Sequence, residues 1–214
     1  MTGDQNDQKL EVSTPKSYKP KTFYLPRLDP EFYRGDAAVH WSLTIFDRKT
    51  GWLDDLFHSR FRELMVHVAV REGLFCPAYC LMPDHLHLLW IGLRRDSDQM
   101  NGMSFLRTHL ARLLSPHKFQ PQAYDHVLRQ EERKRNAFAK TCFYILANPV
   151  RDGLIKESER WPFCGAVIPG YPDLHPLDQD FWPLFWRLYT SSRASDASER
   201  KLPPRNSQET HVLT

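Results

Sequence analysis

The sequence predicts an α+β domain in which helices pack against an antiparallel sheet. Its periodic segments follow the order strand, helix, strand, turn, strand, helix, which is typical of that class. The chain has 214 residues, enough for one domain with a substantial core. With 41% hydrophobic and 26% charged residues, its composition is that of a globular protein.

The first half of the chain supplies the clearest elements. Residues 39–46 alternate as a strand, with Val39, Trp41, Leu43 and Ile45 on one face. Asp54 or Asp55 can then cap a helix that carries an apolar stripe and stops at Gly73. Residues 75–81 and 85–91 form two further strands around a turn at Pro83-Asp84. A second helix starts near Ser104 and ends before Pro116.

His85 and His87 are the most informative residues of the sequence. They lie one residue apart in an apolar strand, so both imidazoles share one face of the sheet, about 6.6 Å apart. Leu86, Leu88 and Trp90 point to the other face and into a core. This spacing allows both rings to reach one metal ion, although a pair of histidines can also serve a purely structural role.

A later helix, predicted over residues 131–147, presents a second polar group. Lys140, Tyr144 and Asn148 are one turn apart and share a face of that helix, and Pro149 favours its end. Taken alone, Tyr144 also fits a packing aromatic, and Asn148 a helix end. Imidazole and amide oxygen together suit Mg²⁺ or Mn²⁺, and histidine also tolerates Zn²⁺.

The remaining features set limits. Net charge is only +3, which does not by itself indicate nucleic-acid binding. The chain contains no apolar run long enough to span a membrane, and we expect a cytoplasmic protein. Residues 1–22 and 191–214 are predicted to be disordered tails around one domain at 23–190. We expect four reduced, mostly buried thiols, at Cys76, Cys80, Cys142 and Cys164.

Three ordered stretches resemble the single-tyrosine HUH transposases, most closely the REP-associated tyrosine transposases of bacteria. The first is Tyr79 to His87, the second is Tyr124 to Arg129, and the third is Tyr144 to Ile155. A Trp-Pro-Phe segment at 161–163 also fits. The resemblance covers about residues 37–172, and the ordered set is far more specific than the His-x-His pair alone.

The resemblance implies a ferredoxin-like (RRM-like) sheet with helices, of the HUH endonuclease type, often paired as a homodimer. His85 and His87 match the family's metal-binding histidines, Asn148 its third ligand, and Tyr144 its nucleophile. The implied activity is Mg²⁺- or Mn²⁺-dependent cleavage and rejoining of single-stranded, hairpin-associated DNA through a 5′-phosphotyrosine intermediate. Such a protein would be associated with the bacterial nucleoid when it is bound to DNA.

Basic residues would contact DNA phosphates. The candidates are Arg94, Arg95, Arg107, Arg112, Lys118, Arg129, Arg133, Lys134, Arg135, Lys140 and Arg151. Two alternatives remain open. One is a domesticated protein that binds DNA hairpins without cutting them, and the other is a metal-dependent hydrolase of small phosphorylated substrates that uses water in place of Tyr144.

Overall fold

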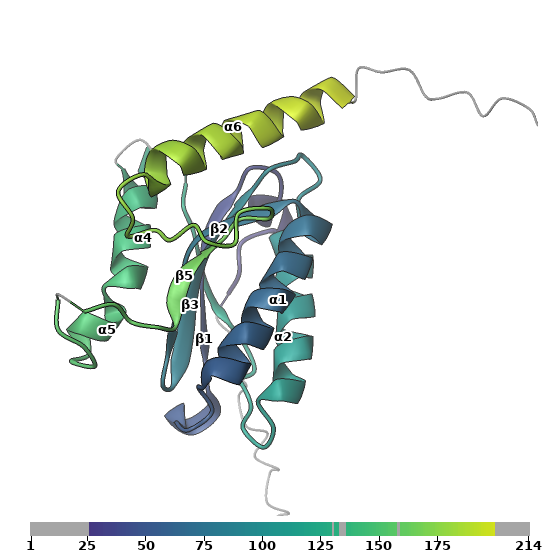
Figure 1. Ribbon diagram of the computed structural model, residues 1–214. Coiled ribbons are helices and arrows are strands. Elements are labelled where there is room, and N and C mark those ends of the chain that lie inside the picture. The colour runs from purple at the N-terminus through teal and green to yellow at the C-terminus, as the bar shows by residue number, and fades with distance from the viewer. Residues whose placement is uncertain (1–25, 130, 133–135, 158, 200–214) are drawn as a thin grey trace, which may run out of the picture.

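A five-stranded antiparallel sheet forms the centre of the structure, a computed structural model that describes residues 26–129, 131–132, 136–157 and 159–199 (Figure 1). The strand order is β4-β1-β3-β2-β5. The strands are β1 (Ala38–Thr44), β2 (Leu74–Met82), β3 (His85–Gly92), β4 (Tyr124–Val127) and β5 (Cys164–Val167).

Helices α1 (Asp55–Glu72) and α2 (Gln99–Leu113) follow β1 and β3 in the chain. The sequence β1-α1-β2-β3-α2-β4, with its strands in the order 4-1-3-2, is the ferredoxin-like arrangement. Strand β5 adds a fifth member beside β2. The predicted α+β, ferredoxin-like fold is therefore confirmed.

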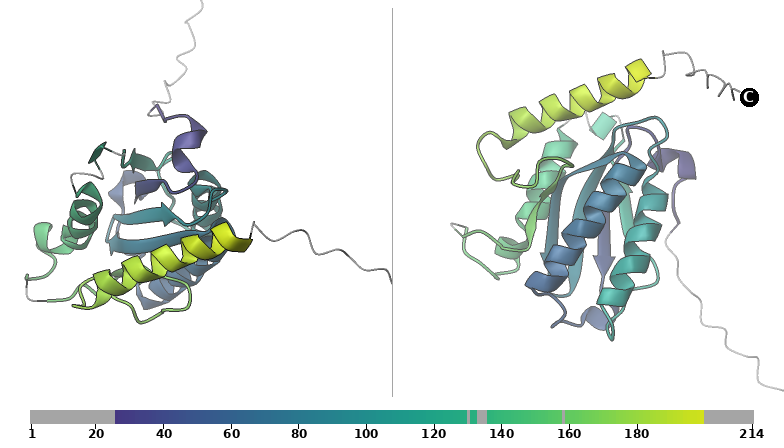
Figure 2. Two further views of the ribbon diagram at one scale, coloured as in Figure 1. Left: turned by 90° about the horizontal axis from the view of Figure 1, so that it is seen from above. Right: turned by 45° about the vertical axis from the view of Figure 1, so that its right-hand side comes forward.

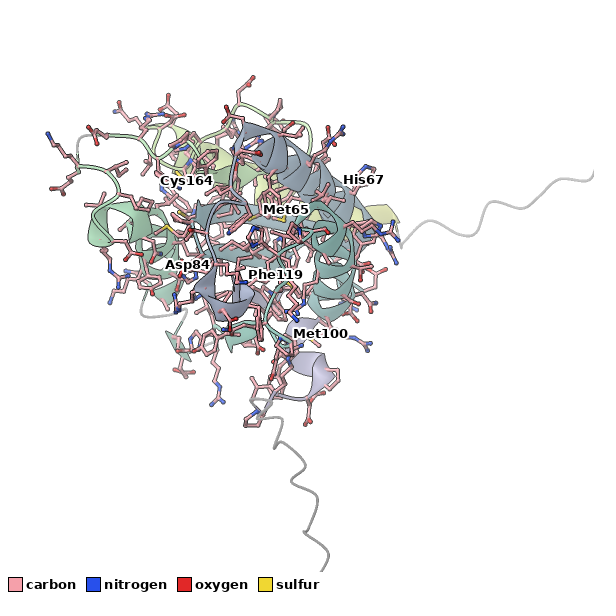
Figure 3. All side chains as sticks on the ribbon, turned by 90° about the horizontal axis from the view of Figure 1, so that it is seen from below. Met65, His67, Asp84, Met100, Phe119 and Cys164 are labelled. Atoms are coloured by element: carbon pink, nitrogen blue, oxygen red, sulfur yellow. The ribbon has the colours of Figure 1, made fainter. Side chains whose placement is uncertain are left out.

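Alternation along the strands separates two cores. Trp41 and Leu43 of β1 pack with Leu88 and Trp90 of β3 against α1 and α2. Neighbouring positions such as Leu89 face the opposite side, where α4 (Ala137–Leu146) and α6 (Phe181–Glu199) cover the sheet. Figure 1 shows α1 and α2 together on one side of the sheet and α4 on the other. Seen from the turn between β2 and β3, side chains such as Met65 of α1 fill the space between the layers (Figure 3).

The helix ends confirm some sequence signals and correct one. Asp54 caps α1 by accepting a hydrogen bond from the Phe57 amide, and Gly73 ends that helix with a left-handed backbone. The start of α2 was predicted near Ser104, which is wrong. Asp98 is the cap instead, since its carboxylate accepts from the amides of Met100 and Asn101, so the helix begins five residues earlier.

The helix predicted over 131–147 is also corrected. Asn136 has a positive φ of 59°, and α4 starts only after it, at Ala137. The helical chain does not stop at Asn148, because a short helix α5 (Asn148–Arg151) follows α4 and takes Pro149 into its first turn. There the missing proline amide removes no hydrogen bond that the helix needs.

Helix α6 lies across one end of the molecule (Figures 1 and 2). Phe181, Phe185 and Tyr189 are buried on its inner side, and the Tyr189 hydroxyl donates to the Gly92 carbonyl. Residues 191–199 were predicted as part of a tail, but they continue this helix. Residues 1–22 and 200–214 lie outside the described residues.

Two smaller expectations can be compared with the structure. All four cysteines are buried free thiols, as predicted. Within the described part of the chain, no helix is both long and apolar enough to cross a membrane.

Candidate active site

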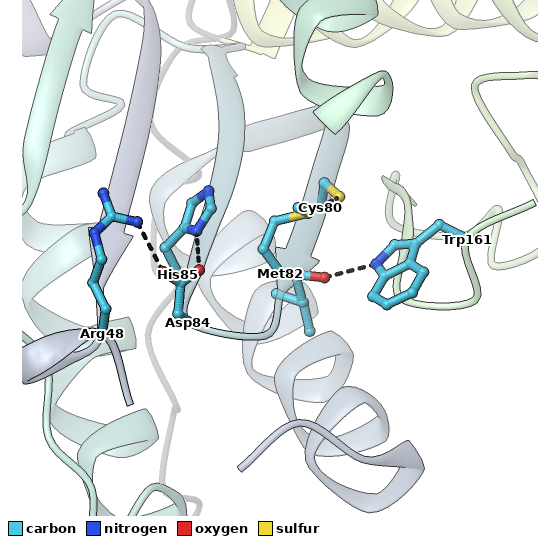
Figure 4. Close-up of polar contacts among 7 residues, drawn as sticks. Arg48, Cys80, Met82, Asp84, His85 and Trp161 are labelled. Atoms are coloured by element: carbon cyan, nitrogen blue, oxygen red, sulfur yellow. Dashed lines mark hydrogen bonds and ion pairs between the residues drawn. The ribbon is translucent and has the colours of Figure 1, made fainter. Parts of the chain in front are cut away.

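The histidine pair lies at the start of β3, on the face that α4 covers. The rings of His85 and His87 are perpendicular and their centroids are 4.8 Å apart. His85 Nδ1 lies 2.6 Å from an Asp84 carboxylate oxygen, and Arg48 Nη1 donates to the other oxygen at 2.8 Å (Figure 4). Burial opposes ionisation of Asp84, but hydrogen bonds from His85 and Arg48 hold its pKa below the usual value. This carboxylate fixes the His85 ring through Nδ1 and leaves Nε2 available.

His40 of β1 is a third histidine in the same place. Its Nε2 atom lies 3.0 Å from His87 Nδ1, and both side chains are buried. Burial lowers the pKa of His40 to about 4, and burial with the neighbouring His40 lowers that of His87 to about 3. Both rings are therefore neutral at neutral pH, and His87 Nε2 has a free lone pair in the tautomer in which its Nδ1–H donates to His40 Nε2.

Nothing in the sequence selected His40, although alternation along β1 places it on the face opposite Trp41. The signal that identifies it is the register of the sheet. Because β1 pairs with β3 so that Ser42 faces His87, His40 is one pleat away and lies diagonally across from His87.

Tyr144 lies over this group on α4. Its ring centroid is 5.9 Å from that of His87 and 6.0 Å from that of His40, with an edge-on arrangement in both cases. The side chain is 43% exposed, so it is accessible from solvent. The Arg151 guanidinium lies 4.7 Å from the ring centroid, and its hydrogen bond with Tyr144 raises the pKa of Arg151.

Asn148 lies one turn after Tyr144 and is buried. Its Nδ2 atom donates to the carbonyls of Tyr144 and Ile145, at 2.9 and 3.1 Å. Both contacts occupy the amide nitrogen, so Oδ1 is the atom that remains free to accept or to coordinate. The one-turn relation between Tyr144 and Asn148 predicted from the sequence is present.

These residues fit the donor set of a divalent cation. In the tautomers that keep the proton on Nδ1, both imidazole Nε2 atoms have free lone pairs, and the contacts above also leave the Asn148 amide oxygen unused. Ring orientation by a carboxylate and by a second imidazole is typical of metal-binding histidines. In the described part of the chain, no three His, Cys, Asp or Glu side chains cluster so as to hold a metal.

The predicted DNA-contacting residues are spread over the molecule. Arg151 is at Tyr144, and Lys140 is exposed on the same helix. Arg107 and Arg112 are on α2, which covers the face of the sheet opposite to the histidines. Arg94 and Arg95 follow β3 at its far end, where Arg94 pairs with Asp96. Arg129 follows β4, where its amide donates to the Glu132 carboxylate. Lys118 lies over the Phe46 ring. The last three candidates, Arg133, Lys134 and Arg135, lie outside the described residues.

The Trp-Pro-Phe segment at 161–163 contacts β2 next to this site. The Trp161 indole donates to the Leu81 carbonyl at 2.7 Å (Figure 4). The Leu81 amide in turn donates to the Phe163 carbonyl at 2.9 Å. Leu81 lies in β2, just before the turn that leads to His85. The segment therefore holds the hairpin on which the histidines are placed.

Comparisons with known proteins bear on the class of protein. No protein-family model matches the chain. The REP-associated tyrosine transposase of Escherichia coli is 27% identical over 124 residues, which cover 56% of this chain and 72% of that protein. A protein of the same designation from Haemophilus influenzae is 23% identical over 163 residues, covering 69% of this chain and 89% of its own length. The chain is thus similar in sequence to the REP-associated tyrosine transposases of these two bacteria.

A solved structure supports the fold in the same way. The structure of a REP-associated tyrosine transposase bound to a REP hairpin matches this chain with a TM-score of 0.53 at 20% identity. The match covers 62% of this chain and 78% of that one. The resemblance drawn from the three motifs is thus confirmed, while the roles of individual residues stay predictions.

Proposed function

We propose that this protein is a metal-dependent DNA strand transferase that cuts single-stranded, hairpin-associated DNA with Tyr144 and rejoins it. One observation carries the proposal: an exposed tyrosine on α4 lies against two buried, neutral histidines of the sheet. The relatives support the class, because their names describe tyrosine transposases, and the matched structure contains a REP hairpin.

His85, His87 and Asn148 would hold Mg²⁺ or Mn²⁺ through their free Nε2 and Oδ1 atoms. A bound divalent cation supplies Lewis-acid stabilisation of charge on a phosphate oxygen. Asp84 and His40 would keep the two imidazoles in the tautomer that presents Nε2. The Asp84–His85 and His40–His87 contacts are already formed in the protein itself, so these rings would need little reorganisation to bind the cation.

Tyr144 would attack the phosphorus atom of the scissile phosphodiester. The new bond joins phosphorus to the phenolic oxygen, and the bond between phosphorus and the 3′ oxygen breaks. The phenolic proton is lost and the 3′ oxygen gains one, which leaves a 5′-phosphotyrosine and a free 3′ hydroxyl. Arg151 is placed to stabilise negative charge near the phenolic oxygen. A later 3′ hydroxyl can reverse the step on another strand without ATP, because one phosphodiester replaces another.

The covalent adduct is the decisive test. Labelled hairpin DNA with a single-stranded extension is incubated with protein and Mn²⁺, and adducts are separated on a denaturing gel. We expect an adduct with the wild type, none with Tyr144→Phe, and none after chelation of the metal. Tyr171→Phe is the matched control, since Tyr171 is also 43% exposed, and it should react as the wild type does.

Other outcomes have defined meanings. An adduct that persists in Tyr144→Phe would reject Tyr144 as the nucleophile. Hairpin binding without any adduct would favour the non-cleaving DNA-binding protein. Turnover of small phosphorylated compounds that survives Tyr144→Phe but is lost in His85→Ala would favour the hydrolase.

A further inference from the structure

A cavity of about 580 Å³ lies between α4, α6 and the end of β3. Its size is in the usual range for sites that take small molecules or parts of larger ones. Five aromatic side chains line it, from both helices: Phe138, Phe143, Trp182, Trp186 and Tyr189. It is separate from the histidine group, and the function proposed above makes no use of it.

Two of the aromatic rings that line the cavity are open to solvent. Phe143 is 55% exposed and Trp186 is 42% exposed. A single exposed apolar side chain is ordinary, but these two come from different helices and border the same cavity. Trp186 is also held in place, since its ring centroid lies 5.2 Å from that of Phe138. The cavity thus has rigid aromatic surface that no other part of the described chain covers.

Polar groups stand at the edge of the same cavity. Arg193 Nη1 lies 3.1 Å from an Asp36 carboxylate oxygen and 2.9 Å from the Tyr189 hydroxyl. Asn136 adds an amide. A ligand that fits must combine a flat apolar face with an edge of hydrogen-bond donors and acceptors. An unpaired nucleobase has both, and stacking on aromatic side chains is the usual way in which proteins hold such bases.

The cavity lies on the same face of the sheet as the proposed active site. Phe143 directly precedes Tyr144 on α4. Ile91, which lines the cavity, is on the same face of β3 as His87 and four residues further, or about 13 Å along the strand. Stacked nucleotides of one strand are about 3.4 Å apart, so a base about four nucleotides from the scissile phosphate can reach the cavity.

We propose that this cavity binds an unpaired nucleobase of the DNA strand whose phosphate is cut at Tyr144. This inference rests on the proposed function. The base stacks against Trp186 and Phe143, and its polar edge meets the Asp36–Arg193 pair and Asn136. The cavity therefore holds the single strand beside the cut through its bases, in addition to contacts that basic residues make with phosphates.

The test compares two oligomers of equal length and charge, oligothymidylate and an abasic oligodeoxyribose phosphate. Binding is followed by tryptophan fluorescence and by anisotropy, with the full chain carrying Tyr144→Phe so that no cleavage interferes. Stacking of one base changes affinity by about 5- to 150-fold. We expect oligothymidylate to bind more tightly than the abasic oligomer by a factor in that range.

Variants at one position then locate the effect. Trp186→Leu keeps an apolar side chain but removes the flat ring, so the preference for oligothymidylate should disappear, while Trp186→Phe should restore most of it. Tyr171→Ala removes an exposed aromatic that does not line the cavity and should change nothing. Thermal unfolding of each variant shows whether α6 still packs.

The outcomes separate this proposal from the preceding one. Equal binding of both oligomers by the parent protein, or an unchanged preference in a folded Trp186→Leu variant, would overturn the base-binding cavity even if adducts form at Tyr144. Base-dependent binding through Trp186 would support it even if the wild type forms no adduct, in which case the strand-transfer activity alone is rejected.

Discussion

The two faces of the central sheet are built from the same strands but do different work. On the face toward α1 and α2, Trp41, Leu88 and Trp90 are fully buried among other apolar side chains. On the opposite face, alternate residues of the same two strands are His40, His85 and His87. The first face is apolar, whereas the second combines its own apolar core under α4 and α6 with polar groups held in fixed positions.

The difference between the two faces explains how a small sheet can contain buried polar groups and remain stable. Buried imidazoles reduce stability unless they are paired, and here each ring nitrogen facing the protein has a partner in Asp84 or in a neighbouring histidine. Apolar packing on the other face offsets the remaining cost. Three experiments test this difference between the two faces of the sheet, and they follow in order of decreasing expected effect.

The largest effect is expected on the apolar face. Leu88→Ala should lower the free energy of unfolding by about 2–5 kcal/mol, because it removes a fully buried side chain and leaves a cavity. Denaturant unfolding measures this change. Leu56→Ala on α1 is the matched control, since Leu56 is 67% exposed and its loss should cost less than about 0.5 kcal/mol. Equal losses in the two variants would contradict the assignment of this face.

On the polar face, His40→Ala should weaken Mn²⁺ binding more than it weakens folding. Removal of a group that orients a metal-binding histidine usually costs about 10- to 100-fold in affinity. Isothermal titration of Mn²⁺ into the two proteins gives the ratio. His126→Ala is the control, because His126 pairs with His40 across the sheet but contacts Glu132. If His126→Ala weakens binding as much as His40→Ala does, His40 has no special role.

Acid should destabilise the polar face selectively. Burial lowers the pKa of His40 from 6.5 to about 4, so the unfolded chain binds a proton in this range that the folded one does not. The contribution of His40 to the free energy of unfolding is therefore fully present above pH 6.5. It falls by about 1.4 kcal/mol per pH unit as the pH drops from 6.5 toward 4. His87 adds to the slope, since burial lowers its pKa to about 3.

Denaturant unfolding of metal-free protein between pH 7 and pH 5 measures that slope. His40→Gln should flatten it, whereas Leu88→Ala should shift the whole curve downward in parallel. A slope that His40→Gln leaves unchanged would show that the acid sensitivity lies elsewhere.

How far the sequence predicts this molecule depends on the length of each element. The strands around His85 and the helix that Asp54 caps follow from alternation and capping signals. Strands β4 and β5 have four residues each, too few for a period to be recognised, and neither was predicted. Helix α4 begins at Ala137 and not at 131 because Asn136 takes a positive φ, a conformation that asparagine tolerates but does not require, so the residue type alone does not mark the break.

The candidate site was predictable to a similar degree. His85, His87, Tyr144 and Asn148 follow from spacing and from the resemblance, and the structure brings Tyr144 against the histidines. His40 and the Arg48–Asp84 contact depend on strand register and on a loop conformation, which single positions in a sequence do not encode. The position of Arg107 and Arg112 on the face away from the histidines was not predictable either, since charge alone does not reveal which layer a helix joins.

The path of the chain around α4 has one further consequence. Strand β4 is one margin of the sheet and β5 is the other, and α4 with α5 lies between them in the sequence. Helix α4, which carries Tyr144, is thus connected along the chain to both edge strands of its own sheet. A substitution that detaches either edge strand is therefore expected to shift Tyr144 relative to His40 and His87.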